Sequence, residues 1–254
     1  MSLPADTPSS LTIIPTSDTQ VHDGVTYTGF TLVSDDLPPI PLSMTPLPRR
    51  CTRQLFVSAH LEMVMRTGYA NHDTSHGYDH ALAVIHNGAV IARRGCFWFT
   101  EEEAVQVLYA LGCHDILDYK MVAAGLAPDA AVIRRQLIDG VGEEAATMIT
   151  HIHENCSWSK RATAVPLQQG DWMRKLVQDA DWLEAIGEGG IQRCIEYTTR
   201  FGNCADVPAR VCEHIREKLL LIPEHLNYPA SRDIAATRVQ PLLDYLAANE
   251  NPQK

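Results

Sequence analysis

The distribution of proline divides this sequence into two parts that cannot fold in the same way. Eight of the fifteen prolines lie within the first 50 residues, together with many serine, threonine and aspartate residues. Proline fixes φ and lacks the N–H that an interior helical residue donates, so this composition disfavours helices. Within it, residues 25–33 (VTYTGFTLV) have the content of a strand, and His22-Asp23-Gly24 is typical of a turn. We expect a β-hairpin or a partly ordered extension over residues 1–50.

From Cys51 onward, apolar residues recur at the spacing of amphipathic helices. Residues 100–103 (TEEE) match a capping box, and the apolar side chains after them share one face of a helix that ends near His114-Asp115. Further helices are predicted over residues 129–138 with a stop at Gly140, 143–154, 171–186 with Asp171 as the N-cap and Gly187 as the stop, 208–221 and 231–246. We therefore predict an all-α fold, with one helical domain over residues 51–250 behind the extension.

The charge and the cysteines exclude several classes of protein. A net charge of −10 would repel a nucleic-acid backbone or an anionic membrane, so neither is expected as a partner. The seven cysteines include no CxxC pair, which argues against a disulfide framework and a cysteine-based zinc site. The first residues, MSLPADTPSS, do not resemble a signal peptide, and there is no run of about 18 apolar residues, so we expect a cytoplasmic protein.

The dipeptide His-Asp occurs three times, at residues 22–23, 72–73 and 114–115, so the dipeptide alone identifies no site. The first pair is explained as turn chemistry. His114-Asp115 differs because it ends an apolar helical stretch, where the departing backbone can aim both side chains at one divalent ion. The alternative is a histidine that caps the last carbonyls of the helix and an aspartate that faces water.

Two other segments carry the same residue types. His76 and His80 are four residues apart, so on a helix they share a face, and the apolar run after His80 indicates that this face turns inward. Asp179 and Asp181 lie in an otherwise apolar helix, and carboxylates are rarely buried without a charged partner or a metal. These two aspartates are about 200° apart on a helix, so one ion is not expected to receive both.

Six segments in order resemble the HD-domain metal-dependent phosphohydrolase superfamily, in particular its small single-domain hydrolases, some of which act on nucleotides. They are SHGYDHALAV, HDILDYK, HENCSWSK, VQDADWLEAIGEGGIQR, EHIREKLLLIP and RDIAATR, and the resemblance covers about residues 53–248. It implies one divalent metal ion (Mn, Mg, Fe, Co or Ni) with the ligands His80, His114, Asp115 and Asp181. The ADxL pattern points to Asp181, whereas periodicity puts Asp179 on the more apolar face. Asp179 is kept as an orienting residue or as the replacement ligand.

The first motif departs from the pattern of these hydrolases. An SHDxxH motif has aspartate directly after its first histidine, whereas this chain has Gly77 there and Asp79 before His80. This departure leaves the acid-base assignment open. His76 is a candidate for orienting a ligand or for protonating the leaving group, and Asp118 is a candidate for orienting water or Lys120, or for capping the turn. The catalytic candidates are Asp115, His76 and Asp118.

Basic residues near these motifs are candidates for binding phosphate. Lys120 and Arg193 follow or lie within the motifs, and Lys160 and Arg161 are outer candidates on the loop over residues 156–170. We expect hydrolysis of a phosphate ester or anhydride in a nucleotide or another small phosphorylated metabolite, through a water activated by the metal. Phosphate or pyrophosphate is the product, and a homodimer is left open.

Two alternative functions belong to other classes of protein. A two-iron oxygenase would need a further histidine between the HD pair and the last aspartate, and His151 and His153 are the candidates. At i and i+2 they diverge on a helix, so at most one is expected near the centre, and His151 is kept as an orienting residue or alternative ligand. The other alternative is a nucleotide-binding module without catalysis, which would need neither residue of the HD pair.

Overall fold

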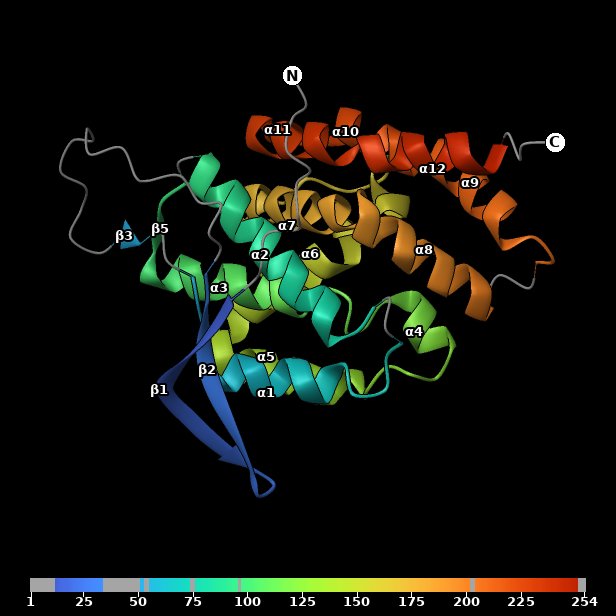
Figure 1. Ribbon diagram of the computed structural model, residues 1–254. Coiled ribbons are helices and arrows are strands. Elements are labelled where there is room, and N and C mark those ends of the chain that lie inside the picture. Colours follow the sequence, from blue (N-terminus) through green and yellow to red (C-terminus); the bar gives the residue numbers. More distant parts are fainter. Residues whose placement is uncertain are drawn as a thin grey trace.

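Helices form most of the chain in the computed structural model, which describes residues 12–33, 51–52, 55–73, 76–95, 97–201 and 204–250. The α-helices are α1 (Ala59–Gly68), α2 (Tyr78–Arg94), α3 (Glu101–Gly112), α4 (Tyr119–Ala123), α5 (Ala130–Val141), α6 (Glu143–Cys156), α7 (Asp171–Glu184), α8 (Glu188–Phe201), α9 (Val207–Glu217), α10 (Ile222–His225), α11 (Pro229–Arg238) and α12 (Gln240–Glu250). Two short 3-10 turns are η1 (Trp158–Lys160) and η2 (Leu219–Leu221). The predicted all-α class is confirmed (Figure 1).

The N-terminal extension contains the expected hairpin. Strands β1 (Thr12–His22) and β2 (Val25–Val33) pair antiparallel, and β2 also pairs with β4 (Phe56–Val57). Asp23 and Gly24 have positive φ values of 50° and 77°, which confirms a turn at the first His-Asp pair. A second, two-stranded sheet joins β3 (Cys51–Thr52) to β5 (Phe99–Thr100). In Figure 1 the hairpin projects from the helices beside α1. Residues 1–11 and 34–50 of the predicted extension lie outside the described residues.

Several helix ends follow from the local signals, and others do not. The capping box is confirmed, because Thr100 Oγ1 accepts from the N–H of Glu103 and Glu103 Oε2 accepts from the N–H of Thr100. The predicted stop at Gly140 is wrong, since α5 continues to Val141 and the next residue, Gly142, ends it with φ of 83°. The predicted N-cap at Asp171 is wrong by one residue, since the cap of α7 is Gly170, which has φ of 78°.

The C-terminal half contains two larger differences. The helix predicted over residues 231–246 is two helices, α11 and α12, which meet at Val239. Helix α8 was not predicted, because its first turn contains Gly189 and Gly190, and glycine lowers helix propensity by about 1 kcal/mol per residue. Packing against α9 and α12 offsets that cost.

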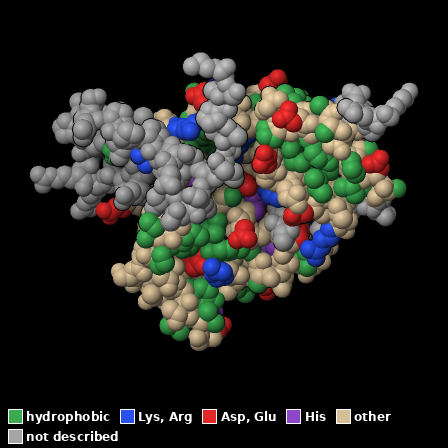
Figure 2. Space-filling view, in the orientation of Figure 1, with side chains coloured by type: hydrophobic (Ala, Val, Ile, Leu, Met, Phe, Trp, Pro, Cys, Tyr) green, Lys and Arg blue, Asp and Glu red, His purple; other side chains and the backbone are tan. Residues whose placement is uncertain are grey.

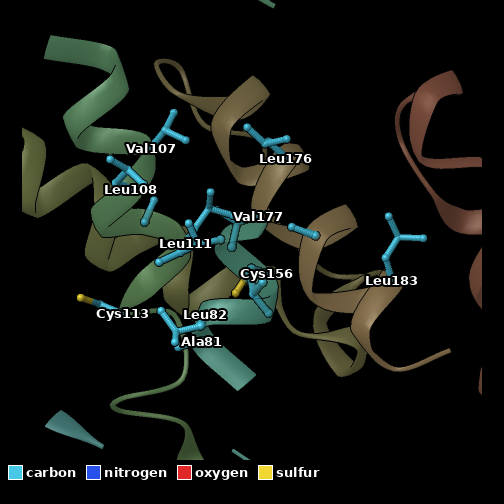
Figure 3. Packing of buried hydrophobic residues seen from close by; sticks show 14 of the residues in the cluster. Ala81, Leu82, Val107, Leu108, Leu111, Cys113, Cys156, Leu176, Val177 and Leu183 are labelled. Carbon is cyan, nitrogen blue, oxygen red and sulfur yellow. The ribbon is translucent and has the colours of Figure 1, made fainter. Parts of the chain in front are cut away.

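Helix α7 lies at the centre of the hydrophobic core. It packs against α2, α3, α6 and α11, and Leu176, Val177 and Leu183 are fully buried. Figure 3 shows Leu111 of α3 and Val177 of α7 close together in this interior, with Ala81 and Leu82 of α2 also directed into it. Within the described residues, no helix is both long enough and apolar enough to cross a bilayer.

Asp179 of α7 accepts hydrogen bonds from the residues that connect α10 to α11. Its side chain is fully buried and accepts hydrogen bonds from the N–H of Asn227 at 2.9 Å, from Asn227 Nδ2 at 2.8 Å and from the N–H of Tyr228 at 2.9 Å. A buried carboxylate with these donors is satisfied without a metal. These contacts do not support the roles predicted for Asp179, which were those of an orienting residue or of the replacement ligand.

A second buried polar link joins α2, α7 and α11. Asn87 Nδ2 donates to the Ala180 carbonyl at 3.1 Å, and Arg238 Nη2 donates to Asn87 Oδ1 at 2.9 Å. Arg238 Nη1 also donates to the Leu183 carbonyl at 2.8 Å. Because Ala180 precedes Asp181, this link helps to set the spacing between Asp181 and the residues of α2.

Asp179→Ala is expected to lower the free energy of unfolding by about 3 kcal/mol, because it leaves buried N–H donors without an acceptor. Urea denaturation followed by circular dichroism measures the change. The control is Asp233→Ala on the exposed side of α11, for which a change within about 0.5 kcal/mol is expected. Equal effects of the two substitutions would contradict this role of Asp179.

Candidate metal centre

Two histidines and two aspartates from three parts of the chain converge on one point. The potential ligand atoms of His80, His114 and Asp181 all lie within 4.8 Å of one another. Asp115 Oδ2 lies 3.4 Å from the Nε2 atom of each histidine, and Asp181 Oδ1 lies 3.5 Å from His80 Nε2 and 3.8 Å from His114 Nε2. The structure thus brings together all four residues for which metal ligation was predicted.

The end of α3 directs His114 and Asp115 toward this point. Helix α3 ends at Gly112, with Cys113 as its C-cap. His114 Nδ1 donates to the Leu111 carbonyl at 2.8 Å, which leaves the lone pair of Nε2 directed at the centre. The histidine therefore does cap a carbonyl at the helix end, as the alternative interpretation held. The same bond fixes the tautomer that a metal ligand requires.

Burial and unmet hydrogen bonding make the four residues fit a divalent cation. His80 Nδ1, His80 Nε2 and His114 Nε2 are buried and have no hydrogen-bond partner. The histidine side chains are 1% and 0% exposed, whereas those of Asp115 and Asp181 are 17% and 23% exposed. Two imidazole nitrogens with two carboxylates form a donor set for first-row divalent metals. The carboxylates line the side open to solvent, where water and substrate can enter.

The electrostatics of the four residues favour a cation between the carboxylates. Burial lowers the pKa of His114, but Asp115 and Asp181 outweigh it and hold the pKa well above its ordinary value. Burial raises the pKa of Asp115, but His114 and His80 outweigh it and hold that pKa well below its ordinary value. The pKa of Asp181 is lowered for the same reason. A divalent ion would take the place of the imidazolium proton.

Helices α4, α8 and α9 add basic residues beside the centre. Lys120 Nζ lies 5.6 Å from the Tyr197 ring of α8, and Asp118 caps α4 by accepting from the Lys120 N–H at 2.9 Å. Burial lowers the pKa of Lys218, the charge of Asp181 opposes this shift, and the charges of Lys120 and Arg193 add to it. We call Lys120, Arg193 and Lys218 the basic cluster. In Figure 2, histidine and basic side chains lie side by side near the middle of one face, with acidic side chains around them.

Sequence reasoning missed Lys218. The residue belongs to the motif EHIREKLLLIP, where it follows the amphipathic helix α9 as its C-cap. A lysine at a helix C-terminus is commonly a solvated cation that complements the helix dipole. Only the packing of α9 against α8 brings it to the basic cluster.

His76 lies near the centre but not on α2. Helix α2 begins at Tyr78, so the predicted shared helix face for His76 and His80 is wrong. The His76 ring instead packs edge-on against Tyr197 with a centroid distance of 5.8 Å. Burial lowers the pKa of His76, and the charge of Asp115 opposes this.

One histidine of α6, His153, contacts α3 near the centre. His153 Nε2 donates to the Ala110 carbonyl at 3.0 Å, and burial, with the charge of His114, lowers its pKa to about 4. Because His153 Nε2 donates to a carbonyl, the lone pair of its neutral imidazole lies on Nδ1.

The outer candidates are not at the centre. Lys160 and Arg161 are exposed, and the Arg161 guanidinium lies 4.2 Å from the centroid of the Trp158 ring. Within the described residues, neither side chain has a contact with the four converging residues. The predicted role of Lys160 in binding substrate stays a prediction.

Comparison with known proteins identifies relatives of the same fold. No family model matches the chain. The Bacillus subtilis protein YpgQ is 30% identical over 138 residues, which are 52% of this chain and 65% of YpgQ, so the match spans just under two thirds of that relative's length. The crystal structure of YpgQ in complex with ADP matches 76% of this chain and 98% of its own, with a TM-score of 0.59 and 23% identity. An HD-superfamily hydrolase of Bacillus thuringiensis matches 76% of this chain and 96% of its own, with a TM-score of 0.54 and 22% identity.

His80→Ala and Asp181→Ala are each expected to weaken binding of Mn²⁺ by at least about 100-fold, because each removes a side chain that faces the centre. Equilibrium dialysis of purified protein measures the affinity. The control is His225→Ala, which removes an exposed histidine of α10 and should leave the affinity unchanged. An unchanged affinity in both test variants would contradict the assignment of the centre.

Metal binding is expected to weaken as the pH falls, because the raised pKa of His114 keeps its imidazole protonated and the ion must displace that proton. Calorimetric titration with Mn²⁺ in buffers of different ionisation enthalpy measures the proton release. An affinity independent of pH with no proton released would contradict this electrostatic account.

Proposed function

We propose that this chain, which has the fold of the HD-domain superfamily, is a metal-dependent phosphohydrolase that acts on a nucleotide or another small phosphorylated metabolite. The observation that carries the proposal is the convergence of His80, His114, Asp115 and Asp181 next to the basic cluster. A divalent cation attracts phosphoryl oxygens, and the basic cluster would hold the rest of an anionic substrate.

The four converging residues would hold one divalent ion, and Mn²⁺ is our first choice. His80 and His114 supply neutral nitrogens from a buried wall, and Asp115 and Asp181 supply charge on the exposed side. When bound, the ion would lower the pKa of a coordinated water and polarise a phosphoryl oxygen. Asp115 also faces both imidazoles, so its loss would disturb the charge balance of the whole centre.

The basic cluster would hold the phosphate groups. Lys120 and Arg193, the two predicted substrate-binding residues near the centre, are joined there by Lys218. Charge-assisted hydrogen bonds to phosphate are about twice as strong as neutral ones. Partial burial strengthens them further, so a local cluster can bind an anion on a chain whose net charge is −10.

A nucleotide is the substrate class that the comparisons favour. YpgQ, which shares the fold, was solved with ADP bound. A two-iron oxygenase ranks lower, because among the described residues the group that could hold a metal is His80, His114 and Asp181, and no histidine of α6 belongs to it. A binding module without catalysis also ranks lower, because it would not need buried imidazoles whose nitrogens lack hydrogen-bond partners.

The first test measures the release of phosphate and pyrophosphate from a nucleotide panel with Mn²⁺ present. Asp115→Ala is expected to abolish turnover, because it removes a carboxylate that faces both imidazoles, while circular dichroism shows the helical content retained. Turnover by the purified, metal-loaded variant at the rate of the parent chain would refute the role of Asp115. Absence of release from every nucleotide by the parent chain would refute the nucleotide hydrolase itself.

Lys218→Ala is expected to raise KM for the active nucleotide by about tenfold or more, because it removes a cation worth roughly 1.5–3 kcal/mol in a hydrogen bond to a charged group. Steady-state kinetics of the metal-loaded protein measures the change. The control is Lys175→Ala, which removes a partly exposed lysine that pairs with Asp171 at 2.9 Å. The same KM in all three proteins would remove Lys218 from the binding site.

A further inference from the structure

Asp73 is a buried carboxylate that faces His76. It belongs to the second His-Asp pair of the sequence, for which no role was predicted, and only 5% of it is exposed. Its Oδ1 atom accepts a hydrogen bond from the His76 backbone N–H at 3.2 Å and lies 3.5 Å from His76 Nδ1. A carboxylate in this place binds one nitrogen of the imidazole and restrains the rotation of the ring.

The backbone at Gly77 explains why the carboxylate comes from upstream. A Cβ atom at Gly77 would lie 2.8 Å from the Asp73 carbonyl oxygen, which is closer than real Cβ contacts allow. Because the obstacle is a backbone atom, no side chain fits at position 77 unless the chain moves. The position after His76 therefore cannot supply an acid in this backbone, whereas Asp73 can.

The other side of the His76 ring belongs to the proposed substrate site. The ring packs against Tyr197, and Tyr197 lies beside Lys120 of the basic cluster. With Nδ1–H directed at Asp73, the lone pair of the His76 imidazole lies on Nε2. The arrangement is that of a base oriented by a carboxylate.

We propose that Asp73 is the positioning residue for His76, and that His76 transfers the proton during hydrolysis; this rests on the proposed function. His76 Nε2 accepts a proton from the attacking water while the water oxygen forms its bond to phosphorus. The bond from phosphorus to the leaving oxygen breaks on the opposite side, the leaving oxygen departs with the electron pair as an anion, and the protonated His76 gives its proton to solvent water. One water is consumed, and His76 ends in the protonation state in which it began. Asp73 keeps its charge throughout and stabilises the transient imidazolium.

Asp73→Asn is expected to lower kcat by about 100-fold, the lower range for acid-base catalysis, with KM and the Mn²⁺ affinity within about threefold of the parent values. Asparagine has nearly the same shape but can direct an N–H at His76 and favour the wrong tautomer. The matched control is Asp79→Asn, which removes an exposed carboxylate from the same stretch and should leave kcat unchanged.

A double-mutant cycle separates positioning from a structural role. If Asp73 acts through His76, Asp73→Asn combined with His76→Ala is expected to lower kcat no further than His76→Ala alone. Independent losses that add in the double variant would overturn the proposal, and so would a normal kcat in Asp73→Asn. Asp73→Ser replaces Asp73→Asn if the latter does not fold.

A spectroscopic measurement tests the proposal without activity. In Mg²⁺-supplied protein with ¹⁵N-labelled histidine, the His76 signals are expected to show the Nδ1–H tautomer, and Asp73→Asn is expected to shift them toward Nε2–H. An unchanged tautomer would overturn the role of Asp73. If the parent chain hydrolyses no nucleotide while the tautomer shifts as expected, the proposed function and the proton transfer fail but the positioning contact stands.

Discussion

The burial of α7 is the constraint on which the rest of the structure depends. This helix packs against α2, α3, α6 and α11, and it carries two aspartates that face in different directions. Asp179 accepts three N–H donors from the connection between α10 and α11, while Asp181 faces the two histidines. The same helix therefore fastens the C-terminal helices to the core and completes the candidate metal centre. Asn87 Nδ2 of α2 donates to the carbonyl of Ala180, the residue between these two aspartates, and so holds this part of α7 against α2.

The centre combines a buried wall with an exposed edge. The imidazoles of His80 and His114 are enclosed by the core, which keeps their geometry fixed and leaves ring nitrogens without hydrogen-bond partners. Asp115 and Asp181 are partly exposed, so charge is available where an ion and its ligands can enter. The basic cluster lies beside these carboxylates, which gives an acidic protein a local site for an anion.

Local signals predicted most helices, and their failures have specific causes. The capping box at Thr100 and the apolar face of α3 were sufficient for that helix. The glycines of α8 concealed a helix that tertiary packing stabilises. Pro241, in the first turn of α12, is the local signal for the break between α11 and α12. His76 was placed on α2 because a spacing of four fits a helix, but the helix begins two residues later. Spacing alone does not say where a helix starts.

The sequence by itself determined the all-α class and the turn at Asp23-Gly24, and its resemblance to a known superfamily predicted the four residues that converge, His80, His114, Asp115 and Asp181. A helical period of 3.6 residues also predicts that Asp179 and Asp181 lie on different faces of their helix. Only the tertiary structure decided which further residues accompany the predicted ones: Lys218 with the basic cluster, His153 beside the end of α3, and Asp73 next to His76. Periodicity fixes the face of a helix on which a residue lies, whereas the packing of helices distant in sequence fixes what that face meets.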